Sequence, residues 1–386
     1  ASATNGIPCP LPYAKVFNDV FVRSTKIDRG APLTPIALLT PLTETTSRGG
    51  YAAAAEDAEG IQNDPFSIPA YLFTLTPVHE TSAKYPMCQE RRRKGDEGCL
   101  FNSPFGEIWD VLTVDAGLET GRMAETLKHY PAAFLAGTYR KDELDALALE
   151  DYVKAGGTLF LSCDYVEEGL ISADLAGVDF GSEVKVKSEG EQGNTPHHSS
   201  TIQLHNAYTL HPGHPHVGTR VLYQDENGVP VVWARELGKG RVVTTAARRS
   251  LPDALNEPCK FGSDAFNARR LTLLDGSAEL GLLRTLLETV QSETIPVKVD
   301  GDIQWGVNRT KDGCLIWLFN NKGIAKFVGE PEDVDPSKTA TVSLAMRNVR
   351  DSAAFAFRDA DTGDTLDPSA VKVAPGDVRF VTVSRK

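Results

Sequence analysis

Residues 152–164 read YVKAGGTLFLSCD: the end of a helix, two glycines, a short apolar strand and a cysteine directly after it. Gly156 and Gly157 are typical of a helix stop. TLFLS is a continuous apolar run, as expected of a strand buried on both faces of a parallel sheet. In an α/β enzyme a nucleophile often lies where such a strand ends. The stretch therefore raises two questions, which fold the chain has and whether Cys163 is reactive.

The flanking sequence continues the alternation of strands and helices. GRMAETLKHY and KDELDALALEDYVKAGG predict helices, and SAELGLLRTLLETVQ (277–291) predicts a helix that closes the domain. VPVVWARELGKGRVVTTAA predicts a hairpin with its turn at LGKG. The other predicted strands are PIALLTPL (35–42), DVLTV (110–114), AAFLAG (132–137) and TLFLSC. This order predicts an α/β fold with a doubly wound parallel sheet.

The pattern changes at about residue 295. From there the chain consists of short apolar strands separated by Gly, Pro, Asp and Asn turns, which predicts an antiparallel β-sandwich. The predicted organisation is an N-terminal arm at 1–34, an α/β domain at 35–292 and the β-sandwich at 293–386.

Composition excludes several classes of partner. The formal net charge is −12, and no basic stripe is present, so nucleic acid is not an expected partner. No run of about 18 apolar residues predicts a membrane span. The first residues, ASATNGIPCPLP, lack the layout of a signal peptide, so we expect a mature or trimmed chain.

The six cysteines are too few for a disulfide-dense scaffold. Cys88 and Cys99 bracket the charged segment QERRRKGDEG, and a disulfide between them would stabilise that loop by about 3 kcal/mol and indicate an oxidising compartment. The alternative is two unrelated thiols. The pairing of Cys9, Cys163, Cys259 and Cys314 stays open. Asn308-Arg309-Thr310 is an N-glycosylation sequon, which also favours a secreted or extracellular protein.

Cys163 lacks the surroundings of a nucleophile elbow. Such elbows have the form G-x-C/S-x-G, because the glycines relieve the strained turn and leave room for an oxyanion hole. The sequence here is LSCDYV, without either glycine. We interpret Cys163 as a structural residue, buried or at a strand edge, either as a thiol or in a disulfide.

The run YPAAFLAGTYRKDELDALALEDYVKAGGTLFLS (130–162), preceded by FGEIWDVLTVDAG and followed by GKGRVV, resembles a known domain. It is similar to the class I glutamine-amidotransferase-like domain, or trimerisation domain, behind the catalytic barrel of bacterial β-galactosidase-type glycoside hydrolases. NRTKDGCLIWLFNNKG and APGDVRFVTV resemble the C-terminal β-sandwich of such carbohydrate-active enzymes.

The resemblance implies a flavodoxin-like sheet without the amidotransferase triad, in a domain that serves assembly and shapes a neighbouring active site. The 29 residues before residue 30 are too few for the catalytic barrel of the family, so we expect no catalytic residue of the family to carry over to the given sequence. We therefore expect the barrel on another chain or on a removed segment, with the arm as the remnant that linked the two.

Histidines form the first candidate site. Six of the eight lie within residues 197–216: His197, His198, His205, His211, His214 and His216. His211, His214 and His216, in HPGHPH, are the candidate metal ligands, because neutral imidazoles suit Zn²⁺ or Cu²⁺. The alternative is a solvated loop, or one that contacts a sugar or a neighbouring chain, and no cofactor is expected overall.

Acidic residues form the second candidate site. Asp110, Asp115, Asp164, Glu167 and Glu168 are expected at or just after the carboxyl ends of predicted strands, where open α/β sheets bind ligands. Glycoside hydrolysis needs two carboxylates, and Asp164, Glu167 and Asp115 are the candidate catalytic residues. The alternative is helix capping or solvation. Trp109, Trp233, Trp305 and Trp317 offer rings for sugar stacking, although Trp233 and Trp317 lie in strand patterns typical of a core.

These features predict a secreted, non-catalytic assembly portion of a glycoside hydrolase-type enzyme, whose partners are a catalytic chain or domain, a polysaccharide and further copies in an oligomer. One alternative is a self-contained polysaccharide hydrolase or lyase that uses the acidic strand ends or the histidine loop. Another is a glycan-binding or structural surface protein.

Overall fold

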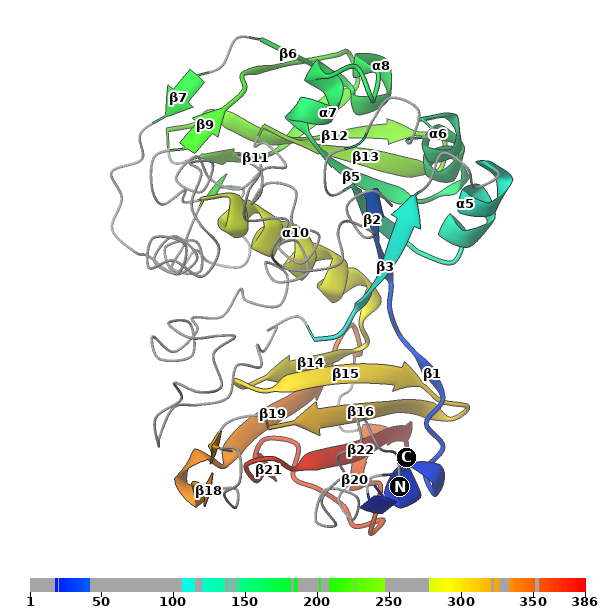
Figure 1. Ribbon diagram of the computed structural model, residues 1–386, viewed down its shortest axis with the longest axis vertical. Helices are drawn as coiled ribbons and strands as arrows, with labels where there is room; N and C mark the ends of the chain where they lie inside the picture. The colour runs from blue at the N-terminus through cyan, green and yellow to red at the C-terminus, as the bar shows by residue number, and fades with distance from the viewer. Residues whose placement is uncertain are drawn as a thin grey trace, which may run out of the picture. The chain divides into compact units, whose positions relative to one another are not determined.

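The computed structural model describes residues 18–19, 21–41, 106–114, 120–135, 139, 144, 146–181, 184–186, 201–202, 208–225, 227–246, 278–320, 323–325, 333–350 and 354–386. Among these residues, no helix is both long and apolar enough to cross a membrane. The chain divides into two compact units (Figure 1). The α/β unit comprises Thr34–Ile295 and Ala325–Asp333, and the β unit comprises the remainder.

The α/β unit is built on one large sheet with the strand order β3-β2-β4-β5-β13-β12-β11-β8. Its strands are β2 (Ile36–Pro41), β3 (Trp109–Val114), β4 (Ala132–Leu135), β5 (Thr158–Ser162), β8 (Thr201–Ile202), β11 (Thr219–Asp225), β12 (Pro230–Leu237) and β13 (Gly240–Thr245). The pairs from β3 to β13 are parallel, and β12 pairs antiparallel with β13 and β11. Numbered among themselves, the five parallel strands follow the order 2-1-3-4-5, which flavodoxin-like sheets have. Our proposal that the sheet is flavodoxin-like rests on this order.

Helices and two small sheets complete the unit. The helices are α5 (Thr120–Leu127), α6 (Ala146–Ala155), α7 (Cys163–Glu167), α8 (Ala173–Ala176) and α10 (Ala278–Thr294). The small sheets pair β6 (Val178–Phe180) with β10 (Gly213–Pro215), and β7 (Val184–Val186) with β9 (Tyr208–Leu210). The predicted helices GRMAETLKHY, KDELDALALEDYVKAGG and SAELGLLRTLLETVQ correspond to α5, α6 and α10, and the predicted parallel strands and hairpin are present. The elements between β5 and β12, namely α7, α8 and β6 to β11, were not predicted.

The glycine pair ends α6 as predicted. Gly156, at a φ of +129°, and Gly157 donate their N–H groups to the carbonyls of Val153 and Tyr152. A Cβ at Gly157 would overlap the Tyr152 ring, so the second glycine lets the helix pack closely before β5 begins. Leu159 and Leu161 then point to one buried face of the sheet, and Phe160 stacks on Phe134 at 4.2 Å between ring centroids on the other. The strand is thus buried on both faces.

The β unit contains two antiparallel sheets, ordered β1-β15-β16-β22-β20 and β14-β19-β21. The elements are β1 (Ala31–Pro32), β14 (Val297–Asp300), β15 (Gln304–Arg309), β16 (Gly313–Phe319), η3 (Pro336–Lys338), β19 (Ala340–Met346), β20 (Phe355–Asp359), β21 (Val371–Val373) and β22 (Val378–Arg385), while β17 (Ile324–Ala325) and β18 (Asp333–Val334) lie at the borders of the units. The side-chain amide of Asn320 donates to the carbonyls of Val373 and Lys338, so this residue ties the end of β16 to β21. The short strands that the sequence predicts after residue 295 correspond to β14, β15, β16, β19, β20, β21 and β22.

The predicted N-terminal arm packs on the β unit over its described residues. β1 pairs antiparallel with β15, opposite Asn308 and Arg309. Arg23 lies 2.5 Å from a carboxylate oxygen of Asp361 and 6.0 Å from the centroid of the Phe380 ring. Residues 21–33 therefore contribute an edge strand and a charged contact to this unit.

Candidate functional site

Cys163 lies where β5 ends, as the first residue of α7. It is buried, with 0% of its surface exposed, and carries a thiol. Its Sγ donates to the Ala246 carbonyl at 3.2 Å. The backbone of Cys163 is helical, and its φ is not positive. Cys163 is therefore buried, as its structural interpretation predicts, and does not lie on the exposed, strained turn of an elbow nucleophile.

Three residues that the sequence analysis treated separately lie close together where β5 ends. Cys163, Glu167 and His211 each place a potential ligand atom within 4.8 Å of the other two. His211 Nδ1 is hydrogen-bonded to Glu167 Oε1 at 2.5 Å. The His211 side chain is 2% exposed and that of Glu167 is 27% exposed, so the cluster reaches solvent through the carboxylate.

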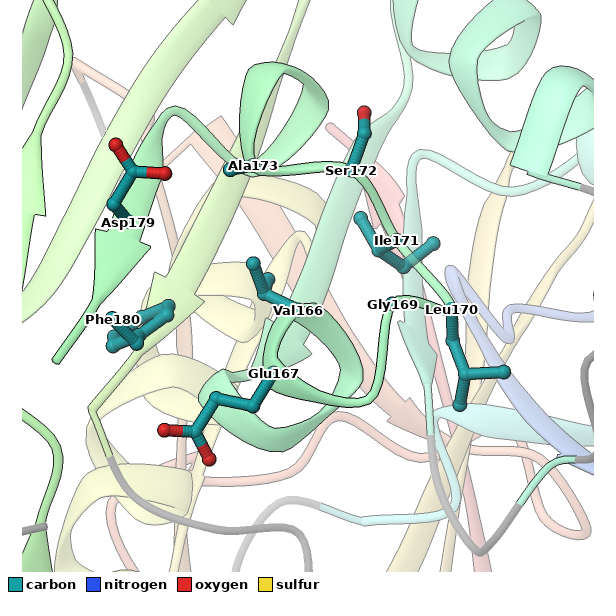
Figure 2. Close-up of a pocket in the computed structure, with 9 residues that line it drawn as sticks. All are labelled: Val166, Glu167, Gly169, Leu170, Ile171, Ser172, Ala173, Asp179 and Phe180. Atoms are coloured by element: carbon teal, nitrogen blue, oxygen red, sulfur yellow. The ribbon is translucent and has the colours of Figure 1, made fainter. Parts of the chain in front are cut away.

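A pocket of about 490 Å³ adjoins the cluster. It is lined by α7, the α7–α8 connection, α8 and β6, through residues that include Glu167, Leu170, Ile171, Asp179 and Phe180. Figure 2 shows the carboxylates of Glu167 and Asp179 on the same side of this view as the Phe180 ring, with Leu170 and Ser172 on the opposite side. The pocket thus combines an apolar wall with two acids.

The three histidines proposed as metal ligands do not form one group. His211 follows β9 and turns inward to Glu167, whereas His214 is exposed on β10. His216 lies between two other acids, 2.9 Å from Asp179 and 3.6 Å from Asp174. Among the described residues, the group with metal-ligand spacing is Cys163, Glu167 and His211. His197, His198 and His205 lie outside the described residues.

The acidic candidates also lie in different surroundings and do not form one group among the described residues. Asp164 is buried beside Cys163, Glu167 lines the pocket, and Glu168 is exposed. The expected position of Asp110 is wrong. It is the second residue of β3 and lies at the amino end of the parallel strands, opposite the edge that carries Glu167. Asp115 lies outside the described residues.

Asp110 instead forms a small polar network with two hydroxyls. Its Oδ2 accepts hydrogen bonds from the Thr34 hydroxyl at 2.7 Å and from the Tyr130 hydroxyl at 2.8 Å. Burial, together with the hydrogen bond to Asp110 and the charge of Asp110, raises the pKa of Tyr130 to about 12. Asp110, which the sequence suggested as part of a ligand crevice, therefore has a structural role.

We expect Tyr130 to make stability depend on alkaline pH. An unfolded tyrosine ionises near a pKa of about 10. Because the folded pKa is higher, the contribution of Tyr130 is fully present below pH 10 and is lost as the pH rises to about 12. Urea unfolding midpoints measured across this window should fall less steeply for Tyr130→Phe than for the wild type. Identical slopes would contradict the assignment.

Three of the four tryptophans are buried and do not present a sugar-binding surface. Trp109, Trp233 and Trp305 are buried, as the strand pattern predicted for Trp233, and Trp317 is partly buried within β16. Aromatic stacking on a polysaccharide through the buried three is therefore wrong. Cys88 and Cys99 lie outside the described residues. Asn308 lies in β15, and its side-chain amide donates to the Arg29 carbonyl at 2.7 Å.

The sequence matches no family model, and no curated protein matches it. Among solved structures, it is similar to Gan42B, a GH42 β-galactosidase from G. stearothermophilus, with 13% identity and a TM-score of 0.42 over 92% of this chain and 40% of that one. The β-galactosidase of Bacillus circulans sp. alkalophilus gives 13% identity and a TM-score of 0.41 over 92% and 42%. The GH42 exo-carrageenase of Bacteroides ovatus gives 9% identity and a TM-score of 0.37 over 92% of this chain and 29% of that one. The chain spans about two fifths of the length of these β-galactosidases.

Proposed function

We propose that this chain is the non-catalytic assembly portion of a secreted glycoside hydrolase-type enzyme that acts on a polysaccharide. Its catalytic barrel would lie on a partner chain or on another segment of the same protein. The α/β unit would assemble the oligomer and shape the neighbouring active site, and the β unit would act as an accessory domain.

The position after β5 carries this proposal. An amidotransferase-like sheet has its nucleophile there, but Cys163 is 0% exposed and its thiol is bonded to a backbone carbonyl. Nucleophilic catalysis needs a group that reaches the substrate. The strand order β3-β2-β4-β5-β13 and the sequence resemblance of residues 130–162 support the same domain type.

Three further proposals belong to this function. We propose a disulfide between Cys88 and Cys99, an oligomeric assembly and N-glycosylation at Asn308. Glycosylation at Asn308 would have to break the hydrogen bond of its amide to Arg29. Peptide mass mapping of the native protein, with and without reductant, tests the disulfide and the glycan together.

A panel of nitrophenyl glycosides and polysaccharides tests the assignment. We expect the purified chain to release no sugar above a buffer control. Turnover that Glu167→Gln abolishes, and that Asp300→Asn does not change, would contradict the proposal. Asp300 is the control because it is exposed and lies in β14 of the β unit.

The second candidate is a self-contained hydrolase or lyase, and one observation favours it. Glu167, from the acidic strand ends, and His211, from the histidine loop, are in direct hydrogen-bond contact beside a pocket that also contains Asp179. A carboxylate bonded to an imidazole and a second carboxylate in one pocket are suited to general acid–base chemistry. Glycan-array binding without turnover would instead favour a glycan-binding surface protein.

A further inference from the structure

We propose that Cys163, Glu167 and His211 form a Zn²⁺ site. This inference does not rest on the proposed assembly function, and it differs from the set of three histidines that the sequence suggested. It follows from where the fold places one sulfur, one oxygen and one nitrogen donor. Zn²⁺ accepts this donor combination.

Local structure brings the donors together from two parts of the chain. Cys163 and Glu167 are four residues apart at the two ends of α7, so they lie on one face of that helix. The Ala246 carbonyl, directly after β13, accepts both the Cys163 thiol at 3.2 Å and the backbone N–H of His211 at 3.1 Å. In the metal-free protein one backbone group therefore positions both the sulfur donor and the histidine, and the thiol hydrogen bond is lost with the proton when a metal binds.

The distances between the donor atoms suit a tetrahedral ion after small shifts of the side chains. Bonds of about 2.0–2.3 Å to zinc place neighbouring ligand atoms about 3.3–3.7 Å apart. The three donor atoms already lie within 4.8 Å of one another. The 2.5 Å hydrogen bond between His211 and Glu167 would open as the ion inserts between them. Glu167 is the most exposed of the three and can move for this purpose.

Charge balance favours a divalent cation. Binding forms a Zn–S bond and breaks the S–H bond of Cys163, and the proton leaves to solvent water. The thiolate, the carboxylate and the neutral imidazole then carry a charge of about −2, which the ion neutralises. Such neutralisation matters here because Cys163 and His211 are buried, and an isolated buried charge is costly.

The adjoining pocket provides the fourth ligand position. Glu167 belongs both to the cluster and to the wall of the 490 Å³ pocket, so the ion would face solvent on that side. Three protein ligands with one position open to water are the arrangement of zinc sites that bind or activate a small molecule. A water molecule would complete the tetrahedron.

Cobalt substitution and zinc titration of the full chain test the site. We expect metal-stripped wild type to take up Co²⁺ with a sulfur-to-cobalt charge-transfer band, and Zn²⁺ to displace the Co²⁺. Because the chain contains other cysteines and histidines, the decisive quantity is the difference between wild type and variant. Cys163→Ser should lose one equivalent and the corresponding part of the band. Glu167→Gln and His211→Gln should bind Zn²⁺ at this site at least about 100-fold more weakly.

Two variants serve as matched controls. His216→Gln removes a histidine of the same segment that is bonded to Asp179 instead, and Cys314→Ser removes a buried thiol of the β unit. Both should retain wild-type uptake. If Cys163→Ser does not fold, as judged by circular dichroism, Glu167→Gln carries the test, because its side chain is partly exposed. Equal metal uptake by wild type and Glu167→Gln, with an unchanged cobalt spectrum, would overturn the proposal.

Discussion

We expect Trp233→Ala to lower the free energy of unfolding of the α/β unit by about 3–5 kcal/mol, the usual cost of truncating a buried tryptophan. Trp233 is 0% exposed in β12, between Val221 of β11 and Thr244 of β13. Its ring packs edge-on against Phe180, with 5.7 Å between ring centroids. A Cβ at Gly213 would lie 2.7 Å from the indole, so β10, which contains Gly213, packs directly against the ring.

Urea denaturation followed by circular dichroism measures this effect. The matched control is Val217→Ala, because Val217 is fully exposed in the turn after β10, and its truncation should change the stability by less than about 0.5 kcal/mol. A loss below about 1 kcal/mol for Trp233→Ala would mean that the hairpin does not form part of the core of the sheet.

Gly240→Ala should destabilise the protein by about 3 kcal/mol or more, at the upper end for overpacking. Gly240 begins β13, where the hairpin meets the end of α6. The N–H groups of Lys239 and Arg241 donate to the carbonyls of Lys154 and Gly157. A Cβ at Gly240 would overlap the carbonyl oxygens of Gly157 and Val153. These are backbone atoms and cannot rotate away, so β13 or α6 would have to shift.

Gly218→Ala is the control for Gly240→Ala. Gly218 has a φ of +88°, but no atom lies within 4 Å of the position of an added Cβ. Its substitution should therefore cost only the backbone strain of about 1–2 kcal/mol. Thermal or urea unfolding of both variants separates steric overlap from strain. A Gly240→Ala protein at least as stable as Gly218→Ala would show that the close approach of the hairpin to α6 is wrong.

Much of the fold could be predicted because its signals are local. TLFLS and AAFL are apolar runs between helix stops and turns, and GKG marks a hairpin whose two strands are both apolar. β11 was not predicted, because TRVLYQD mixes polar and apolar residues and follows a segment rich in histidine and proline. Its pairing with β12 depends on tertiary contacts that the segment itself does not encode.

The site could be predicted only in parts. Glu167 and His211 were each candidates, but they are separated by 44 residues and were assigned to different kinds of chemistry. The spacing of Cys163 and Glu167 is visible in the sequence as four residues. What joins Cys163 to His211 is the Ala246 carbonyl directly after β13, which only the assembled sheet brings there, and Glu167 contacts His211 directly. Asp110 was misplaced although it is the first residue of the predicted strand DVLTV (110–114), because the direction of the chain already puts it at the amino end of that strand.

The assembly role is tested most directly by the composition of the native particle. Mass photometry of the protein from its native source, with peptide mapping of each polypeptide, gives the chains and their ratio. The account predicts a particle that contains, besides this sequence, a catalytic barrel in fixed ratio, on a partner chain or as a continuation of the same chain. A particle built only from this 41.8 kDa chain would contradict it.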